Sequence, residues 1–541
     1  MTYYREAEFN FVNRTGRQEY LNNRKNLAKM INHKDQLIMF FSGAGGSGKT
    51  AVINQVMMYA SEFCRNLIIP FDRYTIRVTA MTGVAATSIN GETLDSAAHT
   101  MKNTANLTQE HRQEWKHTRL LIIDEISFMS VTKLASLNRV LKKLRENYIE
   151  LYGGINVVFC GDFRQLEPVG NSDLPIYKAT GAEKQLFHDA INCFLELKGL
   201  HRFRDDVRWG KVLMRFREGC PTKNDIDLVN SRVVTSKVIL PPNLRYGTYF
   251  NKLRDTINTG LFRKSLKQKS TPSIASKYHL VILCDKLEYK YSNDQHYVPF
   301  KYESEFWTHV GESDCDCGRS NGRFDPMLKL YYECEVMTVK NNLEAGTANG
   351  SQLLVDKVVL NNGEMPFQIM IDGVVCNAVR ASAVKHLIVK SKAAKKENVK
   401  RFYVTPEEKT LKAKFPIPDA FGNHGFKTCK AGKHENEREQ LNHVRAVQLP
   451  IVVNNATTGF KLQGATIDNI FVVENREGHR NWIYVLLSRV KTLDGLFLRK
   501  PIPTNPDHYM VPPELAMMLR DFDERCACPA FDEDDLEDYT E

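Results

Sequence analysis

The sequence predicts an α/β fold built on a parallel sheet with helices on both faces, and two observations carry this prediction. Between Gln36 and about Leu200, short apolar segments alternate with longer helical patterns. Continuous apolar strands separated by helices are typical of a parallel sheet that is buried on both sides. A glycine-rich segment at 43–50 also lies between the first apolar segment and a helical pattern at 51–64. This order of strand, glycine loop and helix is typical of phosphate-binding α/β proteins.

The composition is that of a folded, basic protein. Of the 541 residues, 42% are hydrophobic and 26% are charged, which argues against a chain that is disordered throughout. The length suggests roughly three or four domains. The formal net charge is +10, but residues 521–541 contain ten acidic side chains and one arginine, so the rest of the chain carries +19. A basic body with an acidic tail indicates a polyanionic partner, most simply nucleic acid.

Apolar runs are short throughout the chain. None approaches the roughly 18 residues that a membrane span needs, and the first residues lack the apolar core of a signal peptide. We therefore expect no membrane partner. Cys160 and Cys284 stand in apolar segments, as reduced cysteines do in nuclear or cytoplasmic proteins. We expect one of these two compartments, while a mitochondrial or viral-host setting stays open.

From about Tyr331 the pattern changes to short strands joined by polar and glycine-containing turns. The strand-like segments are 331–340, 351–360, 367–376 and 385–390. They predict a small antiparallel β module. The next stretch, to about Arg438, is rich in lysine and turn formers, and α/β character returns at Val444 and ends near Leu498. The layout is therefore two α/β blocks with a β insertion.

The segment GAGGSGKT at 43–50 satisfies the pattern G-x-x-x-x-G-K-[ST]. Glycines let the backbone wrap closely around phosphate, and its N–H groups act together with the helix N-terminus on anionic oxygens. Lys49 is expected to reach the β- and γ-phosphates of ATP, and the Thr50 hydroxyl to ligate Mg²⁺. A glycine turn that binds nothing is disfavoured because the strand–loop–helix context also fits. The predicted nucleotide-binding residues of the loop are Gly43, Ala44, Gly45, Gly46, Ser47, Gly48, Lys49 and Thr50.

An acidic pair follows the apolar strand at 120–123. Asp124 is expected to hold Mg²⁺, and Glu125 to act as the general base that polarises the attacking water. Acids at a strand end are often only solvated, but this pair shares an α/β block with Lys49. A water-activating glutamate argues against a nucleoside kinase. Arg254, which replaces the aspartate of an Asn-Lys-x-Asp base reader, argues against a GTPase.

A third apolar strand is followed by GDFRQLEPV at 161–169, where Gln165 can orient water or report the loss of the γ-phosphate. With this segment, the chain resembles the motif ladder of superfamily 1B DNA helicases, of the petite-integration-frequency (Pif) and Helitron type. The matching segments are GAGGSGKT (43–50), TAMTGVAA (79–86), DEIS (124–127), GDFRQLEPV (161–169), LHRF (200–203), EAGTANG (344–350), TGFKLQGAT (458–466) and YVLLSRV (484–490). The resemblance covers roughly Phe11 to Leu498.

The resemblance implies two RecA-like P-loop domains with a small inserted SH3-like β domain, and ATP bound between the RecA-like domains. The implied layout is a first RecA-like domain at 1–200 with a small element at about 87–115, a second at 201–330 and 446–505, the insertion at 331–445, and an acidic tail at 506–541. Arg202 and Arg489 would reach the γ-phosphate from the second domain, where a fork of donors stabilises charge on the transferring phosphoryl. Gln18 would read adenine, and Gly464 would belong to the nucleotide site. From its sequence context alone, Arg202 could instead face solvent or DNA.

The resemblance also implies contacts with single-stranded DNA. The residues that match the early contacting motifs are Thr82, Gly83, Thr93, Ser96 and, as a substitute for a missing histidine, His99; those of the fifth motif are Phe460, Lys461 and Thr466. Asp95 stands where the family has a histidine and would repel a phosphate that it faced. Phe460 could stack on a base or pack in the core. Lysines between Lys385 and Lys400 would attract phosphates without reading sequence.

The expected function is therefore an ATP-dependent DNA helicase that moves along single-stranded DNA, 5′ to 3′, and unwinds forked or structured DNA as a monomer. Its cofactors would be ATP and Mg²⁺, and its setting DNA repair or recombination. Two alternatives stay open: a DNA-stimulated translocase that does not separate strands, and a nucleic-acid-binding scaffold with a decayed motor. The pairs Cys315/Cys317 and Cys526/Cys528 are spaced too tightly for a typical zinc site.

Overall fold

The chain forms two compact units in the computed structural model. The first comprises Met1–Ile239 and Gly459–Glu541, and the second Leu240–Thr458. The structure describes residues 36–66, 70–98, 107–168, 174–236, 238–241, 243–267, 279–291, 296–299, 325–340, 347, 350–371, 373–391, 399–413, 442–475 and 480–527. Within these ranges, no helix is both long and apolar enough to span a membrane.

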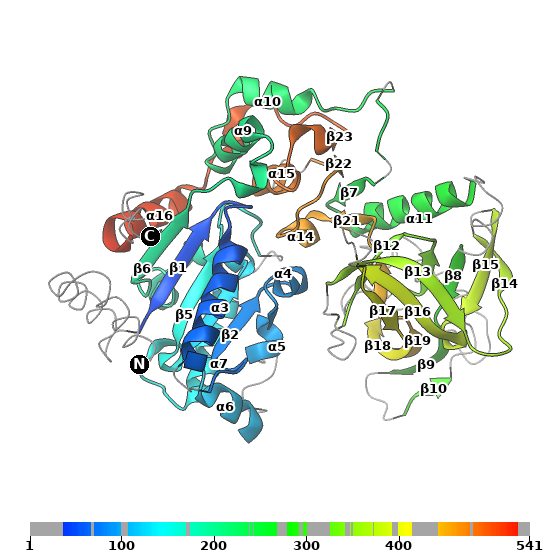
Figure 1. Cartoon of the computed structure of the whole chain (residues 1–541), viewed down its shortest axis with the longest axis horizontal. Helices are drawn as coiled ribbons and strands as arrows, with labels where there is room; N and C mark the ends of the chain where they lie inside the picture. Colours follow the sequence, from blue (N-terminus) through cyan, green and yellow to red (C-terminus); the bar gives the residue numbers. More distant parts are fainter. Residues whose placement is uncertain are drawn as a thin grey trace, which may run out of the picture. The chain divides into compact units, whose positions relative to one another are not determined.

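The first unit contains a six-stranded sheet in the order β3-β2-β4-β5-β1-β6, and each pair of neighbouring strands is parallel (Figure 1). Its strands are β1 Ile38–Gly43, β2 Ile76–Ala80, β3 Glu92–Thr93, β4 Leu120–Asp124, β5 Asn156–Gly161 and β6 Cys193–Leu197. The predicted parallel α/β sheet is thus confirmed. Because parallel strands all end at one edge, the segments that follow β1, β4 and β5 come together there.

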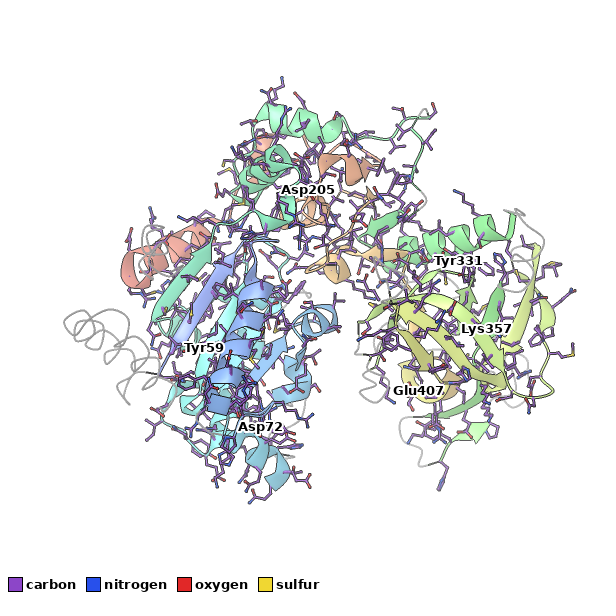
Figure 2. All side chains as sticks on the ribbon, viewed as in Figure 1. Tyr59, Asp72, Asp205, Tyr331, Lys357 and Glu407 are labelled. Atoms are coloured by element: carbon purple, nitrogen blue, oxygen red, sulfur yellow. The ribbon has the colours of Figure 1, made fainter. Side chains whose placement is uncertain are left out.

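The two faces of this sheet carry separate apolar cores. On one face, Phe41 packs with Ile53 and Ala60 of α3, Lys49–Asn66, whose outer side leaves Tyr59 exposed (Figure 2). On the other face, Phe40 packs with α7, Val131–Arg145. Neighbouring strand residues point to opposite faces, so a continuous apolar strand supplies both cores.

The C-terminal helix α16, Pro513–Cys526, completes the second of these cores. Leu515, Met518, Leu519 and Phe522 are buried, and the Phe522 ring lies 6.0 Å from Phe40 and 5.7 Å from Phe194. The predicted acidic tail at 506–541 was therefore wrong over this helix. Its apolar residues recur with a helical period that the acidic composition concealed. Residues 528–541 lie outside the described part of the chain.

Other short elements surround the sheet within the first unit. They are α4 Gly83–Ser88, α5 Leu94–Ala98, α6 Gln109–Lys116, α8 Gly181–Lys184, α9 Val207–Arg217, α10 Lys223–Asn230, α14 Gly459–Leu462, α15 Arg480–Leu487 and the parallel pair β22 Ile470–Val472 and β23 Leu496–Leu498. The apolar run before Arg489 would fit a strand by its composition, but it belongs to α15. Residues 482–487 of this helix are all buried, so no polar face marks its period.

The second unit is mainly antiparallel β structure. Its elements are β7 Arg245–Thr248, α11 Asn251–Lys267, β8 Leu280–Leu283, β9 Asp285–Tyr291, β10 Val298–Pro299, β11 Met327–Leu330, β12 Glu335–Thr338, β13 Gln352–Leu360, β14 Phe367–Ile371, β15 Val374–Arg380, β16 Val384–Ser391, β17 Arg401–Val404, β18 Glu407–Ala413, β19 Asn442–Gln448, β20 Ile451–Val453 and β21 Ala456–Thr458. The sheets follow the orders β10-β9-β19-β18, β11-β8-β15-β14 and β17-β16-β13-β12-β20, and β7 pairs with β21 in parallel.

The β module starts earlier than the sequence predicts. Strand β8 pairs antiparallel with β11 and parallel with β15, so the β module begins near Leu280 and not near Tyr331. The reason is burial: Ile282 packs in one core while Val281 and Leu283 pack in another. A strand buried on both faces is continuously apolar, like a strand of a parallel sheet. The SH3-like character of the module stays a prediction.

Candidate nucleotide site

The phosphate-binding loop lies between β1 and α3, as predicted. Gly46 and Gly48 have φ values of +91° and +100°, which other residues rarely adopt. A Cβ atom on Gly46 would also clash with the Arg202 side chain, and one on Gly45 would lie 3.0 Å from Arg489 Nη2. Glycine is therefore required here both by the backbone conformation and by the close approach of two arginines.

Polar groups of the loop are in place for an anion. Lys49 Nζ donates to the carbonyl oxygens of Gly43 at 2.5 Å and Ala44 at 3.1 Å. Ser47 Oγ is buried and has no hydrogen-bond partner in the part of the chain that the structure describes. A triphosphate would offer the ammonium group and this hydroxyl the anionic acceptors that they lack. The loop thus fits a nucleotide.

Asp124 and Glu125 stand at the end of β4 and are both buried. Burial, and next the charge of Glu125, raise the pKa of Asp124 to about 7, while Lys49 acts in the opposite direction. A carboxyl group that costs energy to ionise here would be stabilised as an anion by a divalent cation. Thr50 supplies a hydroxyl in the first turn of α3. The carboxylate of Asp124 and this hydroxyl are oxygen ligands of the kind that Mg²⁺ prefers.

The backbone of Glu125 is strained. Its φ of +58° and ψ of +45° lie in the left-handed region, which is uncommon for residues other than glycine. The amide N–H of Glu125 donates to Asp124 Oδ1 at 2.9 Å. Such outliers persist where neighbouring structure enforces them, often at active sites.

Gln463 contacts Glu125 directly, a role that the motif match gave no reason to assign. Its Nε2 donates to Glu125 Oε2 at 2.7 Å and to Ser127 Oγ at 2.9 Å, and its Oε1 accepts from the Leu166 amide at 3.1 Å. Gly464 follows at a φ of +83° and faces Glu125 Oε1. The predicted site residue Gly464 thus lies next to the general base.

Arg202 and Arg489 both lie against the phosphate-binding loop. Arg202 Nη1 donates to Ser488 O at 2.8 Å, and Arg489 Nη2 to Ser488 Oγ at 2.7 Å. A Cβ on Gly45 would lie 3.4 Å from Arg202 Nη1. Burial and the neighbouring Arg489 lower the pKa of Arg202 to about 9, and burial lowers that of Arg489. Arg202 and Arg489 repel each other, and the acceptors that they bind on Ser488 are neutral. An anion bound between the two guanidinium groups would therefore be stabilised.

Gln165 is buried beside the end of β5, and its carbonyl oxygen accepts from Asn481 Nδ2 at 2.7 Å. The preceding Asp162 binds Arg217 through two hydrogen bonds of 2.9 and 3.2 Å. Burial raises the pKa of Asp162, but the guanidinium of Arg217 outweighs it and holds the pKa below its usual value. This pair fixes the loop that carries Gln165. Sequence reasoning did not find Arg217, since a lone arginine in a helix gives no signal.

Tyr484 is a further residue that sequence reasoning missed. It is buried among Arg217, Arg489 and Asp162, and its hydroxyl lies near the backbone of Gly45 in the phosphate-binding loop. Burial raises the pKa of Tyr484 to about 12, so it is neutral at physiological pH. Tyr484, which begins the sixth motif, therefore lies beside the phosphate-binding loop, which is the first motif.

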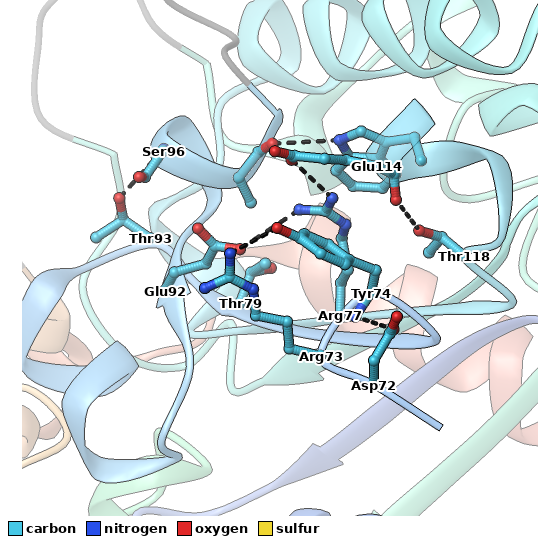
Figure 3. Close-up of polar contacts among 12 residues, drawn as sticks. Asp72, Arg73, Tyr74, Arg77, Thr79, Glu92, Thr93, Ser96, Glu114 and Thr118 are labelled. Carbon is cyan, nitrogen blue, oxygen red and sulfur yellow. Dashed lines mark hydrogen bonds and ion pairs between the residues drawn. The ribbon is translucent and has the colours of Figure 1, made fainter. Parts of the chain in front are cut away.

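The early DNA-contact candidates lie on two segments that a buried arginine holds together. Thr82 caps α4 by accepting the Ala85 amide at 3.2 Å, and Gly83 begins that helix; Thr93 Oγ1 accepts the Ser96 amide at 3.3 Å (Figure 3). Arg77 pairs with Glu92 at 3.5 Å and Glu114 at 3.1 Å, which anchors β3 beside β2. The Arg77 guanidinium also lies 4.2 Å from the Trp115 ring.

Asp95 faces a lysine: its Oδ2 lies 2.7 Å from Lys133 Nζ. In the fifth motif, the ring of Phe460 packs at 6.4 Å from Phe128 and at 5.9 Å from Trp482. The half-buried ring of Phe460 therefore packs against other aromatic side chains, the second of its two predicted roles. Thr466 is exposed. Lys461 lies on α14 with Phe460.

Several predicted residues lie outside the described part of the chain, so their predicted roles stay predictions. They are Gln18, His99, Cys315, Cys317, Cys528, and the lysines at 392, 395 and 396.

Comparison with known proteins finds similarity to one family. Residues 21–208 match the sequence profile of the PIF1-like helicases. The chain is similar to the ATP-dependent DNA helicase Pif1 of Psychrobacter, with 24% identity over 477 residues that cover 85% of this chain and 65% of that protein. This chain therefore spans less than two thirds of that relative's length.

Solved structures agree in fold. The crystal structure of Pif1 helicase from Candida albicans matches 92% of this chain and 98% of its own with a TM-score of 0.61 and 19% identity. Bacteroides Pif1 bound to ssDNA matches 92% and 96% with a TM-score of 0.58 and 18% identity. These structures agree with the predicted pair of RecA-like domains. In sequence over residues 21–208, and in fold over most of its length, the chain is thus similar to the Pif1-like helicases.

Proposed function

We propose that the protein is an ATP-dependent DNA helicase that moves along single-stranded DNA. The observation that carries the proposal is the convergence of Lys49, the acidic pair and two arginines on one glycine loop. A loop that only bound nucleotide would need neither a buried glutamate nor a second arginine. Both are what hydrolysis of a γ-phosphate requires.

The residues divide the chemistry between them. Lys49 and the loop amides bind the phosphates, and Glu125 takes a proton from the attacking water. Arg202 and Arg489 stabilise the charge that develops on the transferring phosphoryl. Asp124 and Thr50 hold Mg²⁺, which supplies charge neutralisation between the phosphates when it is bound.

The strand-binding part of the proposal rests on charge, on family and on position. The body of the chain is strongly basic, and a Pif1 relative of the same fold was solved bound to ssDNA. Thr82 and Gly83 follow β2, and Thr93 and Ser96 lie at and just after β3, where small hydroxyls can contact phosphates without reading sequence. We propose 5′-to-3′ movement, forked or structured DNA as substrate, and a monomeric state.

The first test is steady-state ATP hydrolysis with and without oligo-dT. We expect the strand to stimulate hydrolysis, and we expect Lys49→Ala and Glu125→Gln to lower kcat by about 100-fold or more, because each removes a group that acts in the transition state. Met517→Ala, on the exposed side of α16, is the matched control. Near-normal turnover in either site variant would contradict the assignment.

Strand displacement from 5′-tailed, 3′-tailed and blunt duplexes then tests the helicase itself. Unwinding from the 5′ tail is the expected result, and unwinding only from a 3′ tail would contradict the polarity. Stimulated hydrolysis without displacement would identify a translocase, and no hydrolysis a scaffold. A nuclear or cytoplasmic setting, with a role in repair or recombination, is also proposed. It is supported by the free cysteines among the described residues, including buried Cys160 and Cys284.

A further inference from the structure

The glutamate proposed as general base is held by the side chain of Gln463, the residue that follows α14. Gln463 is 1% exposed, and its amide uses both ends: Nε2 donates to Glu125 Oε2 at 2.7 Å, and Oε1 accepts from the Leu166 N–H at 3.1 Å. One side chain therefore joins the segment after β4 to the segment after β5. A buried amide that is fully paired fixes the groups that it contacts.

The contact with Glu125 is selective for one oxygen. Gln463 binds Oε2, whereas Oε1 faces the backbone at Gly464, where an added Cβ would lie 3.2 Å away. Gln463 thus fixes the plane of the carboxylate and leaves Oε1 as the oxygen that can accept a proton. The donated hydrogen bond also stabilises the ionised form of Glu125, the form that acts as a base.

The same loop touches other parts of the machinery. Arg489 Nη1 lies 3.4 Å from the carbonyl oxygens of Leu462 and Ala465, one on each side of Gln463 and Gly464. Phe460 and Lys461, which are proposed strand contacts, lie on the helix that ends at Leu462. If strand binding shifts this short helix, Gln463, which directly follows it, should shift as well. Glu125 would then move through its hydrogen bond with Gln463.

We propose that Gln463 is a positioning residue that orients the Glu125 carboxylate for hydrolysis and links its orientation to strand binding. This inference rests on the proposed function, since it concerns the base of that reaction. Gln463 acts only through Glu125 and does not itself contact the reacting atoms. Its loss should therefore lower kcat and the strand stimulation while leaving KM for ATP nearly unchanged.

A charged variant of Gln463 tests the contact directly. In Gln463→Glu a second carboxylate replaces the amide at the 2.7 Å contact, and the donor to Glu125 is lost. Two carboxylates at that distance repel each other, so Glu125 should not keep its orientation in this variant.

The experiment compares Gln463→Ala, Gln463→Glu and the exposed control Gln185→Ala in strand-stimulated ATP hydrolysis. We expect kcat to fall about 10-fold to 100-fold in both site variants, with KM for ATP nearly unchanged. Gln185→Ala should match the wild type. Binding of a fluorescent ATP analogue checks that each variant is folded.

A double variant separates positioning from general damage. If Gln463 works through Glu125, then adding Gln463→Ala to Glu125→Gln should lower the residual turnover no further. An additive loss, or an unchanged kcat in the single variants, would overturn the inference while a stimulated wild type leaves the proposed function standing. A wild type without strand-stimulated hydrolysis would overturn both.

Discussion

Asp124 shows how one residue in the site opposes folding. Its pKa in the folded protein is about 7, above the ordinary 3.8, chiefly because of burial. A carboxyl whose pKa is raised on folding stabilises the protein below the ordinary value. That contribution disappears as pH rises from about 4 through about 7. Without nucleotide, the site is therefore less stable at pH 8 than at pH 5 on account of this group.

Asp124→Asn should remove that pH dependence. At pH 8 without Mg²⁺ or nucleotide, we expect the variant to exceed the wild type in the free energy of unfolding by on the order of 1–4 kcal/mol, and at pH 5 by a clearly smaller amount. Urea unfolding at both pH values measures this difference. Asp523→Asn, on the exposed side of α16, is the control. A variant that is less stable than the wild type at pH 8 would contradict the prediction.

At this scale, residues with a fixed spacing could be predicted and residues that act through contacts could not. Lys49, Asp124 and Glu125 stand in patterns that chemistry explains, and the structure places them on one edge of the sheet. Arg217 and Tyr484 contact the site only because segments far apart in the sequence lie together in the fold. No local sequence pattern predicts such a contact. Gln463 was visible as part of a motif, yet its contact with Glu125 depends on how α14 lies.

At the scale of elements, α16 is a structural part of the first unit. Phe522 is fully buried among Phe40, Phe187 and Phe194. Removing such a ring leaves a cavity that neighbouring side chains fill only in part. The sequence hid this helix because its acidic residues share a segment with the acidic stretch beyond it.

Phe522→Ala should therefore lower the free energy of unfolding by about 3–5 kcal/mol. Met517→Ala lies on the same helix at 62% exposure and should change it by about 0.5 kcal/mol or less. Urea unfolding with tryptophan fluorescence compares the two. Equal effects of both substitutions would place α16 outside the core.

Elements were predictable where burial left a pattern. Strands β1, β4 and β5 are buried on both faces and continuously apolar, and the sequence predicted them. The same rule failed at β8, which is also buried on both faces but belongs to a mixed sheet of the β module. It failed again at α15, because an apolar run without a polar face does not distinguish a helix from a strand.

At the scale of the whole molecule, charge is unevenly distributed along the chain. Residues 528–541 contain seven acidic residues and no lysine or arginine, so the chain without them carries a formal charge of +17 in place of +10. Attraction to a polyanion grows with this charge and is screened over about 10 Å at 0.1 M salt. Because α16 is needed for the fold, a deletion should begin after Ala527 and not at Asp521.

Deleting 528–541 should raise affinity for oligo-dT about threefold to tenfold at 50 mM salt, and the gain should vanish near 0.5 M salt because both the long-range field and counterion release weaken there. Fluorescence anisotropy at a series of salt concentrations measures both affinities. A full-length variant with the seven acids replaced by Asn and Gln keeps the length and removes only the charge. If it matches the deletion, charge is the cause. If only the deletion binds more tightly, the segment obstructs the strand by its bulk. Equal affinities of all three proteins at low salt would show that this acidic segment does not act on strand binding at all.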